Sequence, residues 1–373
     1  TRIDPVVKEA VLKSFDLSGN ASSMHGPGRA ASAAINRARI QTAKLIGADP
    51  EEIIFTSGGS ESNNTVLHLI YTQMFENSGR KRIITSSIEH PSVIETVEAF
   101  KKKGVPVTVI GVDAYGKLDM EALRGEAADD VALISVMMAN NEIGTIQDIA
   151  RVAEIAASCG ALVHTDAVQA AGKIVLDVHE LNVDFASISG HKLHGPKGIG
   201  ALYIRKGLNI EPLIHGGHQE HGQRAGTYNT PGIIGLGAAA DIAFRELAAD
   251  MVYIQKLKDR LYHGIKRLIP DVHINGHPVD VLPGTLNVSF PGAEGESILL
   301  YLDMEGISVS TGSACATGSL EPSYVLIETG VGAELAHGSI RFSLGKFNTE
   351  NEVDFVLEIL PPVIKRLREM STL

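Results

Sequence analysis

The stretch FASISGHKLHGPKGIGALYI, residues 185–204, joins two apolar runs through a turn that carries a lysine. Lys192 follows the predicted strand Phe185–Ser189, at the edge of the sheet where α/β proteins bind ligands. A lysine in this position, followed by glycines that permit close approach, suits a Schiff base with an aldehyde cofactor. A surface loop with ordinary lysines is the alternative, and the other segments decide between the two.

Short apolar runs rich in β-branched residues alternate with amphipathic stretches through the first two thirds of the chain. This alternation predicts an α/β fold with a mostly parallel mixed sheet flanked by helices. Further strands are expected at Ile53–Thr56, Arg82–Ser86, Pro106–Ile110, Val131–Met137, Ala161–Thr165 and Gly200–Ile204. Helices are expected at Ser60–Phe75, with Ser60 as a possible cap, and at Pro91–Lys103 and Ile149–Ser158.

The pattern changes near Gly232, where a long helix is predicted over Ile233–Leu268. The rest reads as α+β, and its last helix should be kinked or broken by two prolines. Because single cores stop growing near ~250–300 residues, we expect a large domain over 15–245 and a small one from 1–14 and 246–373. In the small domain, strands are expected at Thr285–Phe290, Ile307–Ser310 and Ser339–Ser343, and the last helix at Glu350–Met370 with Pro361 and Pro362.

Composition narrows the class of protein. The formal net charge of −11 disfavours a nucleic-acid partner, because nucleic-acid binding usually leaves a basic footprint. No apolar run reaches the ~18 residues of a membrane span, so a soluble, cytoplasmic protein without a membrane partner is expected. The two cysteines, Cys159 and Cys315, are far apart, which predicts reduced thiols rather than a disulfide framework or a metal site.

Other strand ends supply polar groups to the same predicted edge. Asp166 ends one strand, where a carboxylate could keep a pyridinium nitrogen protonated; alone, it would more often be a helix cap. His90 could lie flat on a ring, or be an ordinary surface histidine. Asn141 could reach the cofactor or substrate, or only form a turn. Gly59 and Ser60 stand at a helix start that suits a phosphate, although a Gly-Gly-Ser turn alone is weak support.

Together these residues resemble the cysteine desulfurases of the NifS and IscS kind, within the class V aminotransferases and the fold-type-I pyridoxal-phosphate (PLP) enzymes. The resemblance covers essentially the whole chain. It is carried by SSIEHPSV, NNEIG, HTDAVQ, SGHKLHGPKGIG, HGGHQEHGQRAGTYN, STGSACATGS and SIRFSLG.

The resemblance implies a set of roles. Lys192 would bind PLP covalently, Asp166 would face its ring nitrogen, and His90 would stack on the ring and serve in proton transfer. Arg341 would bind the substrate carboxylate, and Cys315 would be the thiol that accepts the sulfur. The remaining roles are cofactor or substrate contacts by Asn141 and Gln169, and phosphate contacts by Gly59, Ser60, Ser189, His191 and Thr227.

Thr227 would reach in from a neighbouring subunit, so the resemblance also implies a homodimer. No resident metal is implied, although Cys315 could hold a transferred cluster transiently. The long spacing from Cys315 to Arg341 resembles the first subgroup, whose extended cysteine loop reaches an iron-sulfur scaffold. Cys159, in an apolar helical pattern, is expected to be a buried small hydrophobe.

The activity that the resemblance implies is removal of sulfur from L-cysteine, giving L-alanine and a persulfide on Cys315 for iron-sulfur assembly or other acceptors. A selenocysteine lyase or another fold-type-I lyase, such as a kynureninase-like enzyme, would keep Lys192 and Asp166. Such rivals need no thiol at Cys315, so turnover of cysteine against selenocysteine separates them. A silent scaffold of the same fold would lack a yellow chromophore after PLP is added.

Overall fold

The computed structural model describes residues 1–74, 79–312 and 321–370, which divide into two compact units. The first unit comprises Thr1–Ile110, Met120–Met138 and Asp148–Leu247, and the second comprises Gly111–Asp119, Ala139–Gln147 and Ala248–Leu373. Residues 1–14, expected in the small domain, here belong to the first unit. Asp4 N, for example, donates to His194 O at 2.9 Å.

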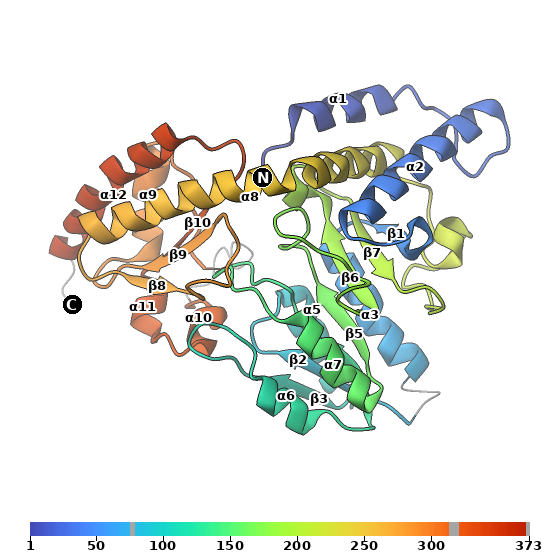
Figure 1. Ribbon diagram of the computed structural model, residues 1–373, viewed down its shortest axis with the longest axis horizontal. Coiled ribbons are helices and arrows are strands. Elements are labelled where there is room, and N and C mark those ends of the chain that lie inside the picture. The colour runs from blue at the N-terminus through green and yellow to red at the C-terminus, as the bar shows by residue number, and fades with distance from the viewer. Residues whose placement is uncertain (75–78, 313–320, 371–373) are drawn as a thin grey trace. The chain divides into compact units, whose positions relative to one another are not determined.

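A seven-stranded sheet forms the centre of the first unit (Figure 1). Its strand order is β1-β7-β6-β5-β4-β2-β3, in which β7 is antiparallel to both of its neighbours, β1 and β6, and the other six strands run in one direction. The expected mostly parallel α/β sheet is thus confirmed. The strands are β1 (Ile53–Thr56), β2 (Arg82–Ser86), β3 (Val107–Ile110), β4 (Val131–Ser135), β5 (Leu162–Asp166), β6 (Phe185–Ser189) and β7 (Gly200–Ile204).

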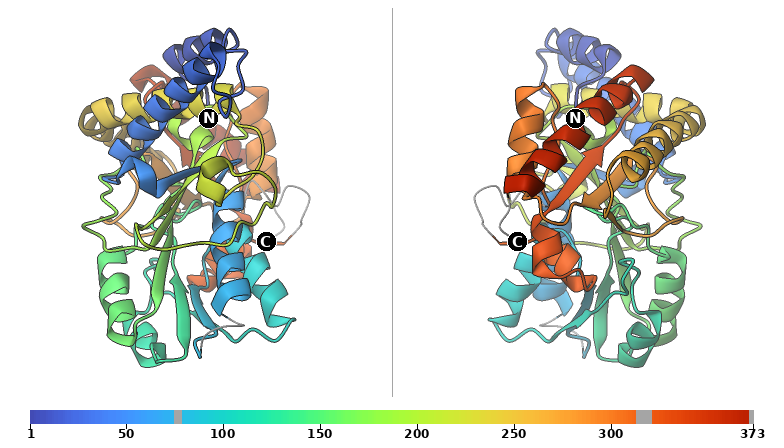
Figure 2. Two further views of the ribbon diagram at one scale, coloured as in Figure 1. Left: turned by 90° about the vertical axis from the view of Figure 1, so that its right-hand side faces the viewer. Right: turned by 90° about the vertical axis from the view of Figure 1, so that its left-hand side faces the viewer.

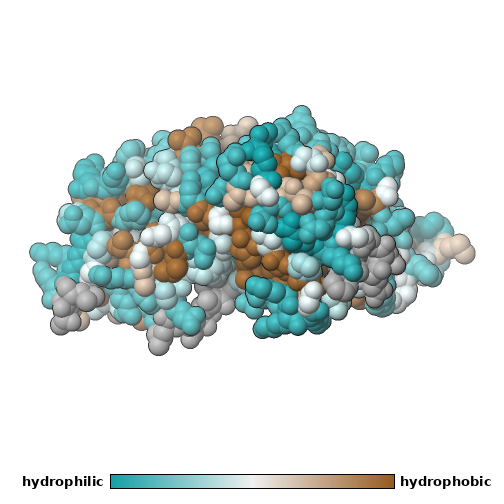
Figure 3. Space-filling model, turned by 90° about the horizontal axis from the view of Figure 1, so that it is seen from below, coloured by the Kyte–Doolittle hydropathy of each residue, from teal (hydrophilic) through white to brown (hydrophobic). Residues whose placement is uncertain are grey.

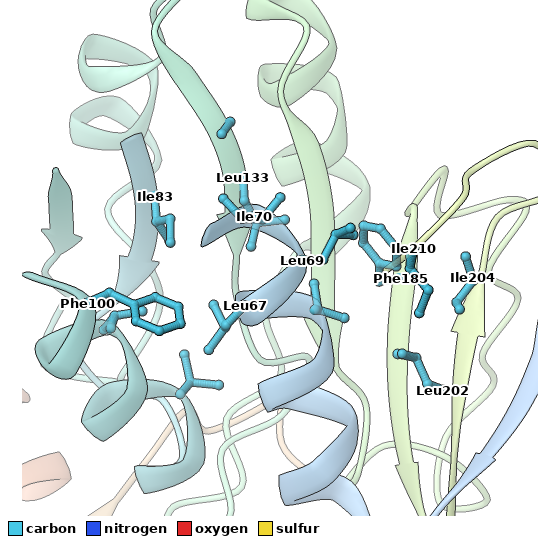
Figure 4. Packing of buried hydrophobic residues seen from close by; sticks show 14 of the residues in the cluster. Leu67, Leu69, Ile70, Ile83, Phe100, Leu133, Phe185, Leu202, Ile204 and Ile210 are labelled. Carbon is cyan, nitrogen blue, oxygen red and sulfur yellow. The ribbon is translucent and has the colours of Figure 1, made fainter. Parts of the chain in front are cut away.

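Helices cover both faces of this sheet, as Figure 2 shows for α3 (Gly59–Leu69) and α5 (Pro91–Lys101) on one side and α7 (Ile149–Cys159) on the other. The α3 and α5 side chains pack with the strands in a buried cluster (Figure 4) that includes Leu67, Phe100 and Leu133. Each such side chain contributes about 1.5–3 kcal/mol when fully buried. This packing fixes the starts of α3 and α5, which follow β1 and β2.

Helix α3 begins at Gly59, one residue before the expected start, so Gly58 and not Ser60 is its N-cap. It ends at Leu69 and continues as one π-helical stretch, η2 (Ile70–Met74). The other helical elements of this unit are α1 (Pro5–Ser14), α2 (Gly26–Leu45), η1 (Pro50–Glu52), α6 (Met120–Glu126), η3 (Gly190–Leu193) and η4 (Gln219–Gly222).

The second unit contains a three-stranded antiparallel sheet, β10-β9-β8, packed with α9 and α12 around its own apolar core. Helix α8 (Thr230–Leu268) contributes residues to both units. The remaining elements are β8 (His273–Asn275), β9 (Thr285–Ser289), α9 (Gly295–Met304), α10 (Tyr324–Glu328), α11 (Ala333–His337), β10 (Ser339–Ser343) and α12 (Glu350–Met370).

Two expectations for the second unit are wrong in detail. The strand expected at Ile307–Ser310 is reduced to a single bridge between Ser310 and Arg341. Of the kink or break expected at Pro361 and Pro362, the break does not occur, because helix α12 is continuous through both residues. Pro362 is exposed, so water can bond the carbonyl group that a proline in a helix leaves without its amide partner.

Hydrophilic residues dominate the face of the molecule seen in Figure 3, and hydrophobic residues form smaller areas between them. Within the described residues, none of the helices has the length and apolar character needed to span a bilayer.

Candidate active site

Glycines let the start of α3 lie close to the end of β6. Gly58 has φ +153°, a conformation that favours glycine. A Cβ at Gly200 would lie 2.7 Å from Gly58 Cα and 2.5 Å from Ile188 O, and one at Gly59 would lie 2.6 Å from Val168 Cγ2. These close approaches require glycine, and they leave the amide groups at the helix start beside β5 and β6.

The polar groups at this helix start include the side chains of Ser189 and His191. Ser189 Oγ lies 2.9 Å from His191 Nδ1, and a Cβ at Gly58 would lie 3.9 Å from Ser189 Oγ. Burial, together with the charge of Lys192, lowers the pKa of His191 to about 4, so its imidazole is neutral near pH 7. Ser60 is exposed in the first turn of α3. Amide groups at a helix start together with hydroxyl and imidazole groups suit an anion such as a phosphate.

Asp166 is buried at the end of β5, and both of its carboxylate oxygens accept hydrogen bonds. Val168 N donates to Oδ1 at 3.0 Å, and Asn63 Nδ2 donates to Oδ2 at 2.7 Å. Each carboxylate oxygen has two acceptor sites, so Asp166 can accept from at least one more donor. The carboxylate is therefore oriented by the protein, and it can still accept from a protonated ring nitrogen.

His90 caps the N-terminus of α5, because its Nδ1 accepts from Ser92 N at 3.1 Å. Burial is the largest influence on its pKa, which is lowered; the Asp166 charge opposes this shift and the Lys192 charge adds to it. The pKa of His90 thus depends on the charges of Asp166 and Lys192, the two residues expected to contact the cofactor. Lys192 itself is half-buried in η3, directly after β6.

Glu89, next to His90, is fully buried and connects the ends of two strands. Ser86 Oγ and Met137 N both donate to Glu89 Oε1, at 2.6 and 2.7 Å. Burial, together with the nearby Asp166 charge, raises the pKa of Glu89 to about 8, although the hydrogen bonds from Ser86 and Met137 oppose this shift. The side chain is therefore mostly a neutral acid at pH 7.

Gln169 and Thr227 are the other first-unit residues with an expected role. Gln169 is half-buried, and its Oε1 accepts from Lys173 Nζ at 2.6 Å, so its amide nitrogen is the group that can address a ligand. Thr227 is exposed and lines a cavity of about 230 Å³ with Ser57 and Gly198.

In the second unit the structure brings Asn141 and Arg341 together. Arg341 Nη1 donates to Asn141 O at 2.7 Å. The backbone of Arg341, on β10, exchanges two hydrogen bonds with Ser310, of 2.7 and 3.2 Å. Asn141 Oδ1 is buried without a hydrogen-bond partner among the residues that the structure describes. The Arg341 guanidinium group and the Asn141 residue whose backbone carbonyl it binds thus form a small polar cluster.

Glu142 belongs to the same cluster, and the sequence assigned it no role. Ser323 Oγ donates to its Oε2 at 2.5 Å, and a Cβ at Gly312 would lie 3.4 Å from that oxygen. Burial raises the pKa of Glu142, whereas Ser323 and Arg341 oppose this shift. Cys315 lies outside the described residues. Cys159 is buried, as expected, and its Sγ lies 3.3 Å from Ala156 O.

Sequence reasoning also missed Asn63, Ser92 and Glu89, although each stands within or beside a quoted motif. They occur in SESNN and in IEHPS, next to residues that were assigned a role. The only feature of the sequence that could have indicated these three residues was their polar type, at positions that the structure shows to be buried or half-buried.

The sequence profile of the family described as aminotransferase class-V matches residues 1–356. The cysteine desulfurase IscS of Methanosarcina thermophila is 50% identical over 356 residues, which cover 95% of this chain and 87% of that protein. A solved structure described as a NifS-like protein has a TM-score of 0.90 at 41% identity, covering 99% of this chain and 96% of the other.

A second solved structure, described as SspA in complex with cysteine, has a TM-score of 0.80 at 33% identity and covers 94% of this chain and 97% of the other. Both family-level matches extend over nearly all of the chain that carries the polar clusters described above. The chain therefore belongs to the aminotransferase class-V family, and within it to the cysteine desulfurases.

Proposed function

We propose that this protein is a PLP-dependent cysteine desulfurase that takes sulfur from free L-cysteine and carries it as a persulfide on Cys315. The observation that carries the proposal is the buried Asp166 carboxylate, which Asn63 and Val168 orient at the end of β5, in a chain 50% identical to a cysteine desulfurase. A relative described as SspA in complex with cysteine supports the choice of substrate.

The residues present fit PLP as the cofactor. Asp166 has acceptor capacity left for a ring nitrogen, and the start of α3 with Ser189 and His191 suits the phosphate. Lys192 is the amine that would hold the aldehyde. When bound, PLP supplies an electron sink that weakens the carbon–sulfur bond of the substrate.

Different residues of the chain would then bind the substrate, transfer the proton and accept the sulfur. Arg341 would bind the substrate carboxylate through its planar guanidinium group, and the Lys192 amine would accept and return a proton. The Cys315 thiolate attacks the substrate sulfur, so a sulfur–sulfur bond forms as the carbon–sulfur bond breaks. The bonding electrons stay with the carbon, which is protonated to give alanine. In balance, the thiol and L-cysteine give the persulfide and L-alanine.

Thr227 is proposed to complete the phosphate site of a second copy of the chain in a homodimer. Its exposure supports a contact outside its own unit. An iron-sulfur scaffold is the proposed sulfur acceptor, because the chain is similar to an IscS protein and the Cys315–Arg341 spacing is long.

The deciding experiment is mass spectrometry of the protein after L-cysteine is added without reducing agent. We expect a gain of about one sulfur atom on Cys315. The variant Cys315→Ala should keep the yellow cofactor absorbance and lose sulfide release, whereas the matched control Cys159→Ala should keep both. Sulfide release by Cys315→Ala, or the added sulfur on Cys159, would refute the proposal.

A further inference from the structure

Four side chains of the first unit form a continuous hydrogen-bonded path from Asp166 to His90. Asn63 Nδ2 lies 2.7 Å from Asp166 Oδ2 and 2.9 Å from Ser92 Oγ. Ser92 Oγ lies 2.8 Å from His90 Nδ1. The path therefore joins the carboxylate assigned to the ring nitrogen with the imidazole assigned to the ring face.

The direction of each bond follows from the chemistry of the groups. An ionised carboxylate can only accept, so the Asn63 amide must turn its nitrogen toward Asp166. The second proton of that nitrogen points to Ser92 Oγ, whose own proton is then directed to His90 Nδ1. Asn63 is 1% exposed, so water cannot readily replace either bond.

His90 Nδ1 also accepts from the backbone amide of Ser92 at 3.1 Å, and an amide nitrogen cannot accept in return. Nδ1 must therefore be without a proton, and the neutral imidazole carries its proton on Nε2. The positive end of α5 disfavours a charged imidazole at this cap, and burial acts in the same direction.

Resting on the function proposed above, we propose that Asn63 and Ser92 are positioning residues that hold His90 as the neutral tautomer with its proton on Nε2. In this state Nε2 is a hydrogen-bond donor. The remaining lone pair, on Nδ1, faces Ser92, so His90 cannot take up a proton there without losing the contact from the Ser92 backbone amide and reversing the bond to the Ser92 hydroxyl. His90 thus acts by donating from Nε2, and Lys192 is left as the group that accepts protons from the substrate.

The test is ¹⁵N NMR of the cofactor-loaded protein with labelled histidine, in which the His90 signals are identified by their loss in His90→Gln. We expect one protonated nitrogen, Nε2, and one unprotonated nitrogen, Nδ1, at pH 7. Ser92→Ala and Asn63→Ala should each change the tautomer ratio by about 3- to 10-fold, the effect of one net hydrogen bond. Ser92→Thr, which keeps the hydroxyl, should restore the ratio.

Thr96→Val is the matched control, because it removes a hydroxyl one turn later on α5 that bonds Asn64 and the Ser92 carbonyl. Its tautomer ratio should equal that of the wild type. A proton on Nδ1 in the wild type, or an unchanged ratio in Ser92→Ala, would overturn the inference; Ser92→Ala keeps the backbone cap, so it tests the path even where Asn63→Ala does not fold. The NMR result does not depend on turnover, so an enzyme that releases no sulfur yet gives the expected signals would refute only the proposed function.

Discussion

The polar cluster around Asp166 in the first unit differs from the one around Arg341 in the second. Asp166 accepts with both oxygens, from Asn63 and Val168, and is oriented from two sides. In the second cluster, Asn141 Oδ1 and Glu142 Oε1 are buried without a partner among the residues that the structure describes.

The difference lies in Asp166 and Asn141 themselves, because each cluster also has another buried oxygen without a donor among the described residues, Asn63 Oδ1 in the first and Glu142 Oε1 in the second. A buried oxygen without a donor costs about 1–3 kcal/mol, and a ligand that brings a donor can recover part of that free energy. The two donors that orient Asp166 suit a cofactor that stays bound. The cluster around Arg341 suits a substrate that enters with its own charged and hydrogen-bonding groups.

The strongest test of this comparison removes the amine of Lys192, the residue of the first unit that is expected to hold the cofactor. Lys192→Ala should lower turnover by about 10²–10⁴-fold or more, because both cofactor attachment and proton transfer are lost. Borohydride reduction followed by peptide mass spectrometry should label Lys192 in the wild type. Lys197→Ala, an exposed lysine of the same loop, should keep the label and the activity. A labelled peptide from another part of the chain would contradict the assignment.

A smaller effect is expected from the second cluster. Arg341→Ala should lower kcat/KM by about 10- to 100-fold, mostly through KM, because a charge-assisted bond to the substrate carboxylate is lost. Arg341→Lys should recover only part, since lysine lacks the planar fork. Steady-state kinetics measure both, with the exposed Arg366→Ala as control. An unaltered KM in Arg341→Ala would remove this residue from substrate binding.

The smallest expected effect is on the free energy of unfolding. It concerns Glu89, the mostly neutral acid near Asp166. The pKa of Glu89 is about 8 in the folded protein and 4.5 ordinarily, so the unfolded chain loses this proton at lower pH. Its contribution to stability is complete below about pH 4.5 and is lost as the pH rises toward 8.

Glu89→Gln keeps the acceptor for Ser86 and Met137 but cannot ionise. Its unfolding free energy relative to the wild type should therefore rise between pH 4.5 and 8, by roughly 2–4 kcal/mol in total. Urea unfolding across this range measures the difference, with the exposed Glu95→Gln as control. A difference that stays constant with pH would mean that Glu89 is ionised in the folded protein.

Much of the fold could be read from local patterns. The apolar runs that became β1, β2, β6 and β7 were expected with the bounds observed, because short buried strands flanked by polar turns have a strong local signature. The expectation at Ile307–Ser310 failed, since an apolar run forms a strand only when a neighbouring strand offers a full register. There, only Ser310 finds a partner.

The sequence by itself determined the residue types that do the chemistry, because Lys192, Asp166, His90 and Arg341 stand in motifs at fixed distances from strand ends. Only the tertiary structure decided how they are held. Asn63 reaches Asp166 across 103 positions of the chain, and Glu89 reaches Met137 across 48. Such contacts depend on how helices and strands pack, and packing brings together residues whose separation in sequence carries no periodic signal.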